Sequence, residues 1–271
     1  MTLLVNILRV LFACVWTGVV GVPLIVSIYV SWAYGLLRAW FGRRDVLDRV
    51  LEANAYFTGW VAQRLWASVL LPVTGIRLRT REVTPVDWDA AHVICANHAS
   101  VFDILALVRA VPPPFRFVAK RELLKWPIIG WALRPAGQIV VDRSDHASAM
   151  RSMTEAAQRQ IRGQVIFFVE GTRTHNGRLQ PFKKGAFHFA TDRQLKVLPT
   201  AVCGSYAVLA KVPWWRLQPG RDIEIVFCSP IAPLPHPRGE TAARAVEALL
   251  TLTREQLAAA LAGAEQRPTS V

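Results

Sequence analysis

Short apolar runs alternate with longer mixed segments along most of the chain. Runs that predict buried strands cover residues 92–96, 115–119, 137–142, 164–169, 196–202 and 222–228. Apolar residues at helical spacing predict helices at 101–110, 126–133, 145–162, 184–193 and 240–262. This alternation of strands and helices predicts an α/β fold with a mixed sheet flanked by helices.

The N-terminal segment has a different pattern, because residues 10–37 contain no charged side chain. A helix needs about 20 apolar residues to cross a bilayer core, so this run is long enough to span the membrane or re-enter it. Arg38, Arg43 and Arg44 follow the run and only Arg9 precedes it, which predicts that the later residues face the cytoplasm. We therefore expect an N-terminal hydrophobic, membrane-anchoring helical segment; the alternative is a buried core helix.

Residues 45–71 also carry apolar side chains at helical spacing. Two interpretations remain open: an amphipathic helix in the membrane interface, or a helix that packs under the sheet. Polar residues and loops become frequent from Gly75 onward. We predict membrane-anchoring helices at 1–74, the main domain at 75–262 and a disordered tail at 263–271.

The composition favours a membrane surface as a partner. The chain carries 32 Lys and Arg against 19 Asp and Glu, a net charge of +13, with 52% hydrophobic residues and ten Trp. Basic and aromatic residues together suit an anionic lipid surface. A nucleic-acid binder would share the charge but rarely the hydrophobicity, so we expect no nucleic-acid partner. The segment 211–216, with its two tryptophans, is a candidate second membrane contact; the alternative is that both rings fill the core.

The four cysteines lie scattered in apolar segments without Cys-x-x-Cys spacing: Cys14, Cys95, Cys203 and Cys228. We expect buried free thiols and a reducing compartment.

A histidine and an aspartate, His98 and Asp103, lie five positions apart where a predicted strand turns into a predicted helix. A turn at this point brings the carboxylate back to one imidazole nitrogen and leaves the other facing the end of the strand. Such a pair is suited to general-base catalysis, because the carboxylate fixes the tautomer and stabilises the imidazolium that forms. The alternative is a capping box from Ser100 to Asp103, in which the acid only closes the helix.

Other predicted strands also end in polar residues. The strand at 115–119 leads to Lys120, and the strand at 164–169 leads to Glu170, Gly171, Thr172 and Arg173. Gly171 lets the backbone turn closely, and an arginine can grip a phosphate with two hydrogen bonds. Ligands of open α/β sheets bind at such strand ends.

These blocks resemble, in content and order, those of the glycerolipid acyltransferases typified by 1-acylglycerol-3-phosphate acyltransferase. Asn97, His98 and Asp103 match the first block, and Lys120, Leu123, Pro127 and Gly130 are similar to the second. The third block is matched by residues 168–174, with Val169 and Thr174 in place of the usual proline and serine. Pro199 matches the fourth block, and residues 182–185 match a Phe-Lys-x-Gly run. The resemblance covers about residues 90–205 and implies a glycerolipid acyltransferase-like fold.

The resemblance also implies a reaction. His98, held by Asp103, would deprotonate the hydroxyl of a lysolipid, which would attack an acyl thioester. Lys120 and Arg173 would bind the acidic head group, while Glu170, Gly171 and Thr172 would shape the acceptor site. A backbone amide near Gly171 would help to stabilise the oxyanion. No metal and no cofactor is implied, since acyl-CoA or acyl carrier protein enters as the donor substrate.

Three functions remain open at this point. The first is acylation of 1-acylglycerol-3-phosphate to phosphatidic acid, at a bacterial-type inner (cytoplasmic) membrane with the catalytic domain facing the cytoplasm. The second is the same chemistry on another lysolipid, such as a lyso-ornithine lipid or a lysophospholipid. The third is a catalytically silent basic membrane-binding protein, which the set of His98, Asp103, Glu170 and Arg173 disfavours. Acyl chain length and oligomeric state have no signature in the sequence.

Overall fold

The fold is described for residues 2–42, 44–126, 129–133, 136–142, 163–212, 216–235 and 239–266 of the computed structural model. Four predicted features lie wholly or partly outside these ranges: the helix at 145–162, the tryptophan pair Trp214–Trp215, Pro127 of the second block and residues 267–271 of the tail. The tail residues 263–265 are helical and not disordered as predicted.

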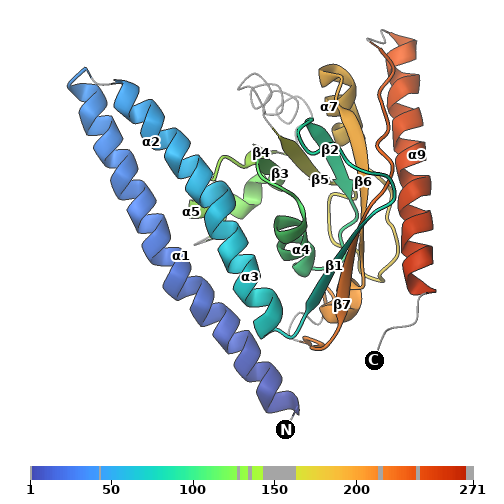
Figure 1. The fold of residues 1–271 in the computed structure, drawn as a ribbon, viewed down its shortest axis with the longest axis horizontal. Helices are drawn as coiled ribbons and strands as arrows, with labels where there is room; N and C mark the ends of the chain where they lie inside the picture. The colour runs from blue at the N-terminus through green and yellow to red at the C-terminus, as the bar shows by residue number, and fades with distance from the viewer. Residues whose placement is uncertain are drawn as a thin grey trace.

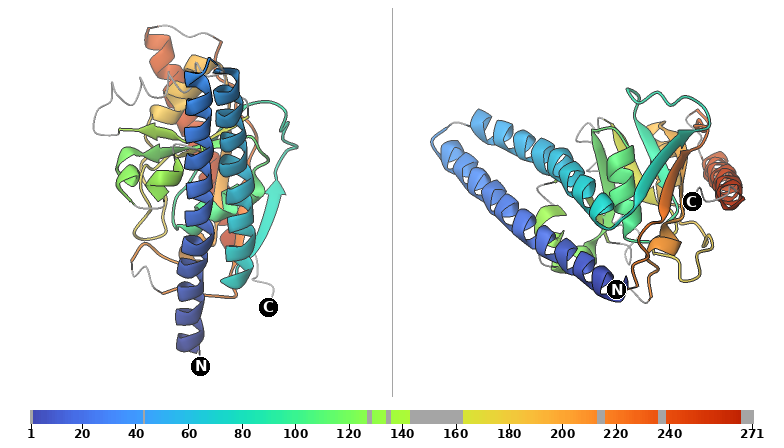
Figure 2. Two further views of the ribbon diagram at one scale, coloured as in Figure 1. Left: turned by 90° about the vertical axis from the view of Figure 1, so that its left-hand side faces the viewer. Right: turned by 60° about the horizontal axis from the view of Figure 1, so that its bottom comes forward.

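A long helical hairpin forms the N-terminal part of the molecule. Its first arm is α1 (Thr2–Trp40), and its second arm is α2 (Arg44–Tyr56), a π-helical segment (Phe57–Ala62) and α3 (Gln63–Val73) (Figures 1 and 2). The arms approach closely at Gly35, where an added Cβ would lie 3.0 Å from Leu47 Cδ1. Trp66 on α3 donates an indole hydrogen bond of 3.1 Å to Thr17 Oγ1 on α1. The arms are therefore packed on each other.

The predicted membrane-spanning helix is not confirmed. In the described ranges, no helix combines the length and the hydropathy needed to cross a membrane. Residues 10–37 are helical as expected, but they form the middle of α1, which lies against the second arm of the hairpin.

From Phe57 onward the second arm packs against the rest of the fold, as one of the two interpretations of residues 45–71 predicts for that part. Trp60 donates its indole N–H to the carbonyl of Phe115 over 3.1 Å. Arg64 donates to the carbonyls of Val111 at 2.9 Å and Arg109 at 3.2 Å. This part of the hairpin therefore covers the sheet and the helix that follows β2.

The predicted mixed α/β sheet is confirmed. Within the described residues, seven strands lie in the order β1-β7-β6-β2-β5-β3-β4, and every neighbouring pair is parallel except β6 with β7. The strands are β1 (Arg77–Glu82), β2 (His92–Ala96), β3 (Phe115–Lys120), β4 (Ile139–Val141), β5 (Gln164–Phe168), β6 (Lys196–Cys203) and β7 (Asp222–Phe227). Strand β1 was not among the predicted strands.

Helices cover both faces of the sheet (Figure 1). Ile94 and Ala96 of β2 face the core shared with α3 and α4, whereas Val93 and Cys95 face the core shared with α7 and α9. This alternation follows from the two-residue repeat of a strand. The remaining helices are α4 (Phe102–Ala110), a 3-10 turn (Arg121–Lys125), α5 (Ile129–Leu133), α7 (Gly185–Arg193), α8 (Ser205–Val208) and α9 (Glu240–Glu265).

Three cysteines in the described ranges, Cys95, Cys203 and Cys228, are buried free thiols, as predicted. Burial raises the pKa of Cys228 to about 11, so its thiol stays protonated at neutral pH.

Candidate active site

Three parallel strands bring the predicted site residues to one edge of the sheet. Strand β5 lies between β2 and β3, and all three run in the same direction. His98 comes two residues after β2, Glu170 comes two residues after β5, and Lys120 ends β3. This is the carboxyl edge, where open α/β sheets bind ligands.

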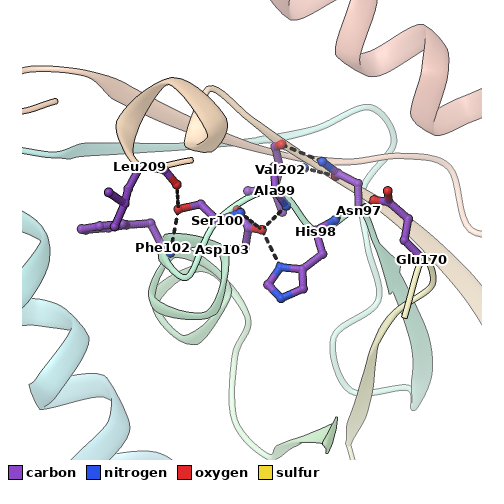
Figure 3. Close-up of polar contacts among 9 residues, drawn as sticks. All are labelled: Asn97, His98, Ala99, Ser100, Phe102, Asp103, Glu170, Val202 and Leu209. Carbon is purple, nitrogen blue, oxygen red and sulfur yellow. Dashed lines mark hydrogen bonds and ion pairs between the residues drawn. The ribbon is translucent and has the colours of Figure 1, made fainter. Parts of the chain in front are cut away.

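The His98 imidazole is oriented by a buried carboxylate. Asp103 lies in the first turn of α4 and is fully buried, and its Oδ2 is 2.7 Å from Nδ1 of His98 (Figure 3). This contact assigns the ring proton to Nδ1. The lone pair on Nε2 remains for a substrate proton, as a general base requires.

The same carboxylate oxygen also closes the start of α4. Oδ2 of Asp103 accepts backbone hydrogen bonds from Ala99 N at 2.7 Å and Ser100 N at 2.9 Å. The capping-box interpretation is met only in part: Asp103 accepts from the Ser100 N–H, but the Ser100 hydroxyl accepts from Phe102 N and donates to Leu209 O. Asp103 therefore closes the turn and also holds the histidine. Three N–H donors on one buried carboxylate oxygen fix the turn and the ring together.

A phenylalanine fixes the plane of the imidazole. The ring of Phe168, the last residue of β5, stacks on His98 with centroids 3.8 Å apart and an interplanar angle of 15°. Phe117 of β3 stacks in turn on Phe168 with centroids 6.1 Å apart. His98 is thus held at its edge by Asp103 and on one face by Phe168.

The backbone of His98 is held by the segment that follows β5. Its N–H donates to Glu170 Oε1 over 2.8 Å, and its carbonyl accepts from the N–H of Thr174 over 2.9 Å. The other oxygen of Glu170 accepts from Gln180 N at 2.8 Å. Burial raises the pKa of the Glu170 carboxyl, and hydrogen bonds from the His98 and Gln180 amides offset part of this shift. Glu170 therefore contacts the protein backbone with both oxygens, and its acceptor-shaping role stays a prediction.

Asn97 ties the same loop to β6. Its amide nitrogen donates to Val202 O over 3.0 Å, and its carbonyl oxygen accepts from Val202 N over 2.7 Å (Figure 3). This pair replaces the backbone ladder at the point where β2 has ended, so the loop leaves the sheet in a fixed direction.

The predicted cationic residues differ in their environment. Lys120 is half exposed and forms a 2.8 Å ion pair with Glu122 Oε1. Arg173 is partly buried, and within the described part of the chain its guanidinium forms no hydrogen bond or ion pair with another residue. Arg173 is therefore the better placed of the two to bind an incoming anion.

Gly171 forms the turn after β5. It has a φ of +76°, a conformation that favours glycine. Its N–H donates to the carbonyl of Phe168 over 3.0 Å. The amide of Gly171 is therefore engaged in the turn, which disfavours it as an oxyanion donor.

The family resemblance is confirmed by comparison with known proteins. Residues 73–203 match the model of the Acyltransferase family. Among curated proteins, the chain is similar to mouse 1-acyl-sn-glycerol-3-phosphate acyltransferase alpha, with 35% identity over 54% of this chain and 52% of the relative. It is also similar to a chloroplastic 1-acyl-sn-glycerol-3-phosphate acyltransferase of Arabidopsis thaliana, with 31% identity over 83% of this chain and 59% of the relative.

A solved structure has the same fold. The crystal structure of the 1-acyl-sn-glycerophosphate acyltransferase PlsC from Thermotoga maritima superposes with a TM-score of 0.60 at 23% identity, covering 95% of this chain and 99% of that one. The chain thus spans between half and three fifths of the two curated relatives, and almost all of the solved one.

Several contributors to the site were not predicted as such. Phe168, Thr174, Gln180 and Val202 act through contacts with residues far away in sequence. Phe168 and Thr174 lie inside the third family-like block, and Val202 ends the predicted strand that carries Pro199 of the fourth. For Gln180 and Val202 the sequence carries no separate signal, because the partner of each is a backbone or amide group that only the fold brings near.

Proposed function

We propose that this protein transfers a fatty acyl group from an acyl thioester, acyl-CoA or acyl carrier protein, to the free hydroxyl of 1-acylglycerol-3-phosphate. The 2.7 Å contact between His98 Nδ1 and buried Asp103 carries this proposal. It supplies an oriented base at a strand edge that also presents Lys120 and Arg173. The match of residues 73–203 to the model of the Acyltransferase family supports the reaction class.

The proposed reaction is a direct displacement at the thioester carbonyl. Nε2 of His98 takes the acceptor hydroxyl proton while the oxygen attacks the carbonyl carbon, and Asp103 stabilises the imidazolium. The tetrahedral intermediate collapses, the C–S bond breaks, and the imidazolium returns the proton to the thiolate. Phosphatidic acid and a free thiol leave, and His98 is neutral again.

Each predicted site residue takes a role in this scheme. His98 is the base and Asp103 orients it. Lys120 and Arg173 bind the acceptor phosphate, with Gly171 and Thr172 forming the turn that presents Arg173. Glu170 is assigned a positioning role, because both of its oxygens bind backbone amides of the site loops.

The purified protein in detergent tests the reaction directly. It is supplied with a panel of lysolipids and with each donor in turn, and the lipid products are identified by mass spectrometry. The proposal expects phosphatidic acid from 1-acylglycerol-3-phosphate at a higher kcat/KM than from any other acceptor. A preferred neutral or zwitterionic acceptor would assign the same chemistry to another lysolipid. No acyl product from any pair would leave only a membrane-binding role.

We also propose that the protein associates with an anionic membrane surface through the hairpin, on the cytoplasmic side of a bacterial-type inner membrane. Large apolar side chains are exposed along α1, and Trp40 and Phe41 at its end are 86% and 70% exposed. The net charge of +13 supports attraction to anionic lipids. Apolar burial combined with electrostatic attraction is typical of interfacial helices.

Vesicle co-sedimentation tests the association. The double variant Trp40→Ala/Phe41→Ala is expected to lower binding to phosphatidylglycerol vesicles, and added salt to lower it further. Leu234→Ala removes another exposed apolar side chain and is the matched control. Equal binding of the double variant and the control would exclude this part of the hairpin as the contact.

A further inference from the structure

The segment that follows β6 lies against the site. Helix α8 and the residues up to Val212 form this segment. Ser100, in the His98 loop, donates its hydroxyl to the carbonyl of Leu209 over 2.7 Å (Figure 3). Tyr206 donates its hydroxyl to the carbonyl of His175 over 2.9 Å. The segment therefore contacts both the base-bearing loop and the residues that follow Arg173.

A lysine of this segment reaches the Arg173 region. Nζ of Lys211 lies 2.9 Å from Nε2 of His175 and 3.4 Å from Oγ1 of Thr172. An ammonium has only donors, so the imidazole accepts at Nε2 and carries its own proton on Nδ1. Neutral His175 and the Thr172 hydroxyl thus hold the ammonium. Both residues lie within two positions of Arg173 in the sequence.

The charge of Lys211 is not neutralised by a carboxylate within the described ranges, since both of its contacts are to neutral groups. In this it differs from Lys120, which Glu122 neutralises. A phosphate monoester carries a charge of about −1.5 to −2 at neutral pH. Arg173 alone cannot balance that charge, and Lys120 carries Glu122 as its counter-ion, so a further cation without a carboxylate partner completes the balance.

We infer that Lys211, positioned by His175, is a further head-group ligand of the acceptor site and binds the phosphate monoester together with Arg173. This assignment rests on the proposed function, because it takes the acceptor to be a lysolipid phosphate. Lys211 contacts substrate, whereas His175 acts through Lys211.

Steady-state kinetics of the full chain with 1-acylglycerol-3-phosphate tests the assignment. Lys211→Ala is expected to raise the acceptor KM about tenfold, the lower end of the loss of a charge-assisted hydrogen bond. The donor KM and kcat should stay within about twofold, and Lys211→Arg should restore much of the loss because it keeps the charge. Lys196→Ala is the matched control, since Lys196 is an exposed lysine at the opposite end of β6.

His175→Ala separates positioning from binding. It leaves the Lys211 ammonium in place but removes its 2.9 Å acceptor, so the acceptor KM should rise less than in Lys211→Ala. The double variant should be no worse than Lys211→Ala alone, because both changes act on one contact.

The outcomes are distinguishable. The inference alone would be overturned if the wild-type protein acylates 1-acylglycerol-3-phosphate and Lys211→Ala has the same acceptor KM as Lys196→Ala. The proposed function would then still hold. A fall in kcat with every substrate pair, not restored by arginine, would show that Lys211 only tethers the segment after β6 to Thr172 and His175, and would also overturn the inference. A wild-type protein without activity on any phosphate-bearing lysolipid would overturn the proposed function and the inference with it.

Discussion

The two parts of the candidate site lie at the same sheet edge but are built in different ways. The His98 loop, residues 97–103, is held by buried hydrogen bonds, and its carboxylate Asp103 is fully buried. The head-group cations, Lys120, Arg173 and Lys211, are at least partly exposed. A proton transfer needs fixed geometry, because misplacement of a reacting group is costly, whereas an anion can be bound by long, adjustable side chains. The rigid His98 loop therefore serves proton transfer, whereas the exposed cations serve recognition of the head group.

Removing the base is expected to have the largest effect. General-base removal costs about 10²–10⁴-fold in rate, so His98→Ala should lower kcat by at least that range while the thermal transition stays near that of the wild type. His188→Ala, on α7, removes a half-buried histidine outside the site and is the control. Near-normal turnover of His98→Ala would exclude His98 as the base.

The spacing in sequence predicted this loop well, because its main contacts are local. Asp103 reaches His98, Ala99 and Ser100 within five residues of sequence. The contact between Glu170 and His98 spans 72 residues and the contacts of Lys211 span 36–39, and only the fold brings these partners together. For this reason the family-like blocks identified Glu170 as a site residue but did not predict that it binds backbone amides.

Strand β1 shows a second limit of pattern-based prediction. The sequence of Arg77–Glu82 has charged residues at four of its six positions and no buried side chain, so it lacks the apolar run that predicted the other strands. It lies at the sheet edge, where Arg77 and Arg79 pair with Asp222 and Arg81 pairs with Glu224 on β7. Charged edge strands also oppose pairing with a second sheet, and this pattern follows from the strand's place in the fold.

Removing Arg173 is expected to have the next largest effect, on recognition and not on chemistry. A hydrogen bond to a charged group is worth about 1.5–3 kcal/mol, so Arg173→Ala should raise the acceptor KM by about tenfold or more with little change in the donor KM. Arg173→Lys should recover only part, since an ammonium lacks the planar fork. Equal effects on both substrates would contradict the separation of chemistry from recognition.

Glu170 holds the His98 loop to the segment after β5, so its removal is expected to lower the free energy of unfolding. Both oxygens accept from backbone N–H groups, so Glu170→Gln leaves one donor facing an amide NH₂, and should cost about 1–3 kcal/mol of unfolding free energy. Chemical denaturation measures this loss, with exposed Glu255→Gln on α9 as the control.

The pH dependence of stability sharpens this prediction. Burial raises the pKa of Glu170, so the folded state keeps the proton where the unfolded chain has lost it. The contribution of Glu170 to the unfolding free energy is therefore fully present below the ordinary pKa near 4.5 and is lost as pH rises through the raised value. Glu170→Gln should abolish this component. The same pH slope in wild type and variant would contradict a raised pKa.

The smallest predicted effect is a gain in recognition at the cationic side of the site. Glu122 pairs with Lys120 at 2.8 Å on the surface, and the hydrogen bond from Lys120 lowers the pKa of the Glu122 carboxyl. Glu122→Gln should free Lys120 for the acceptor phosphate and lower the acceptor KM, by less than about fivefold because exposed ion pairs are weak. The effect should disappear in a Lys120→Ala background, and Glu255→Gln again controls for the loss of one negative charge. An unchanged acceptor KM in Glu122→Gln would show that Lys120 does not reach the head group and that recognition rests on the cations beside β5.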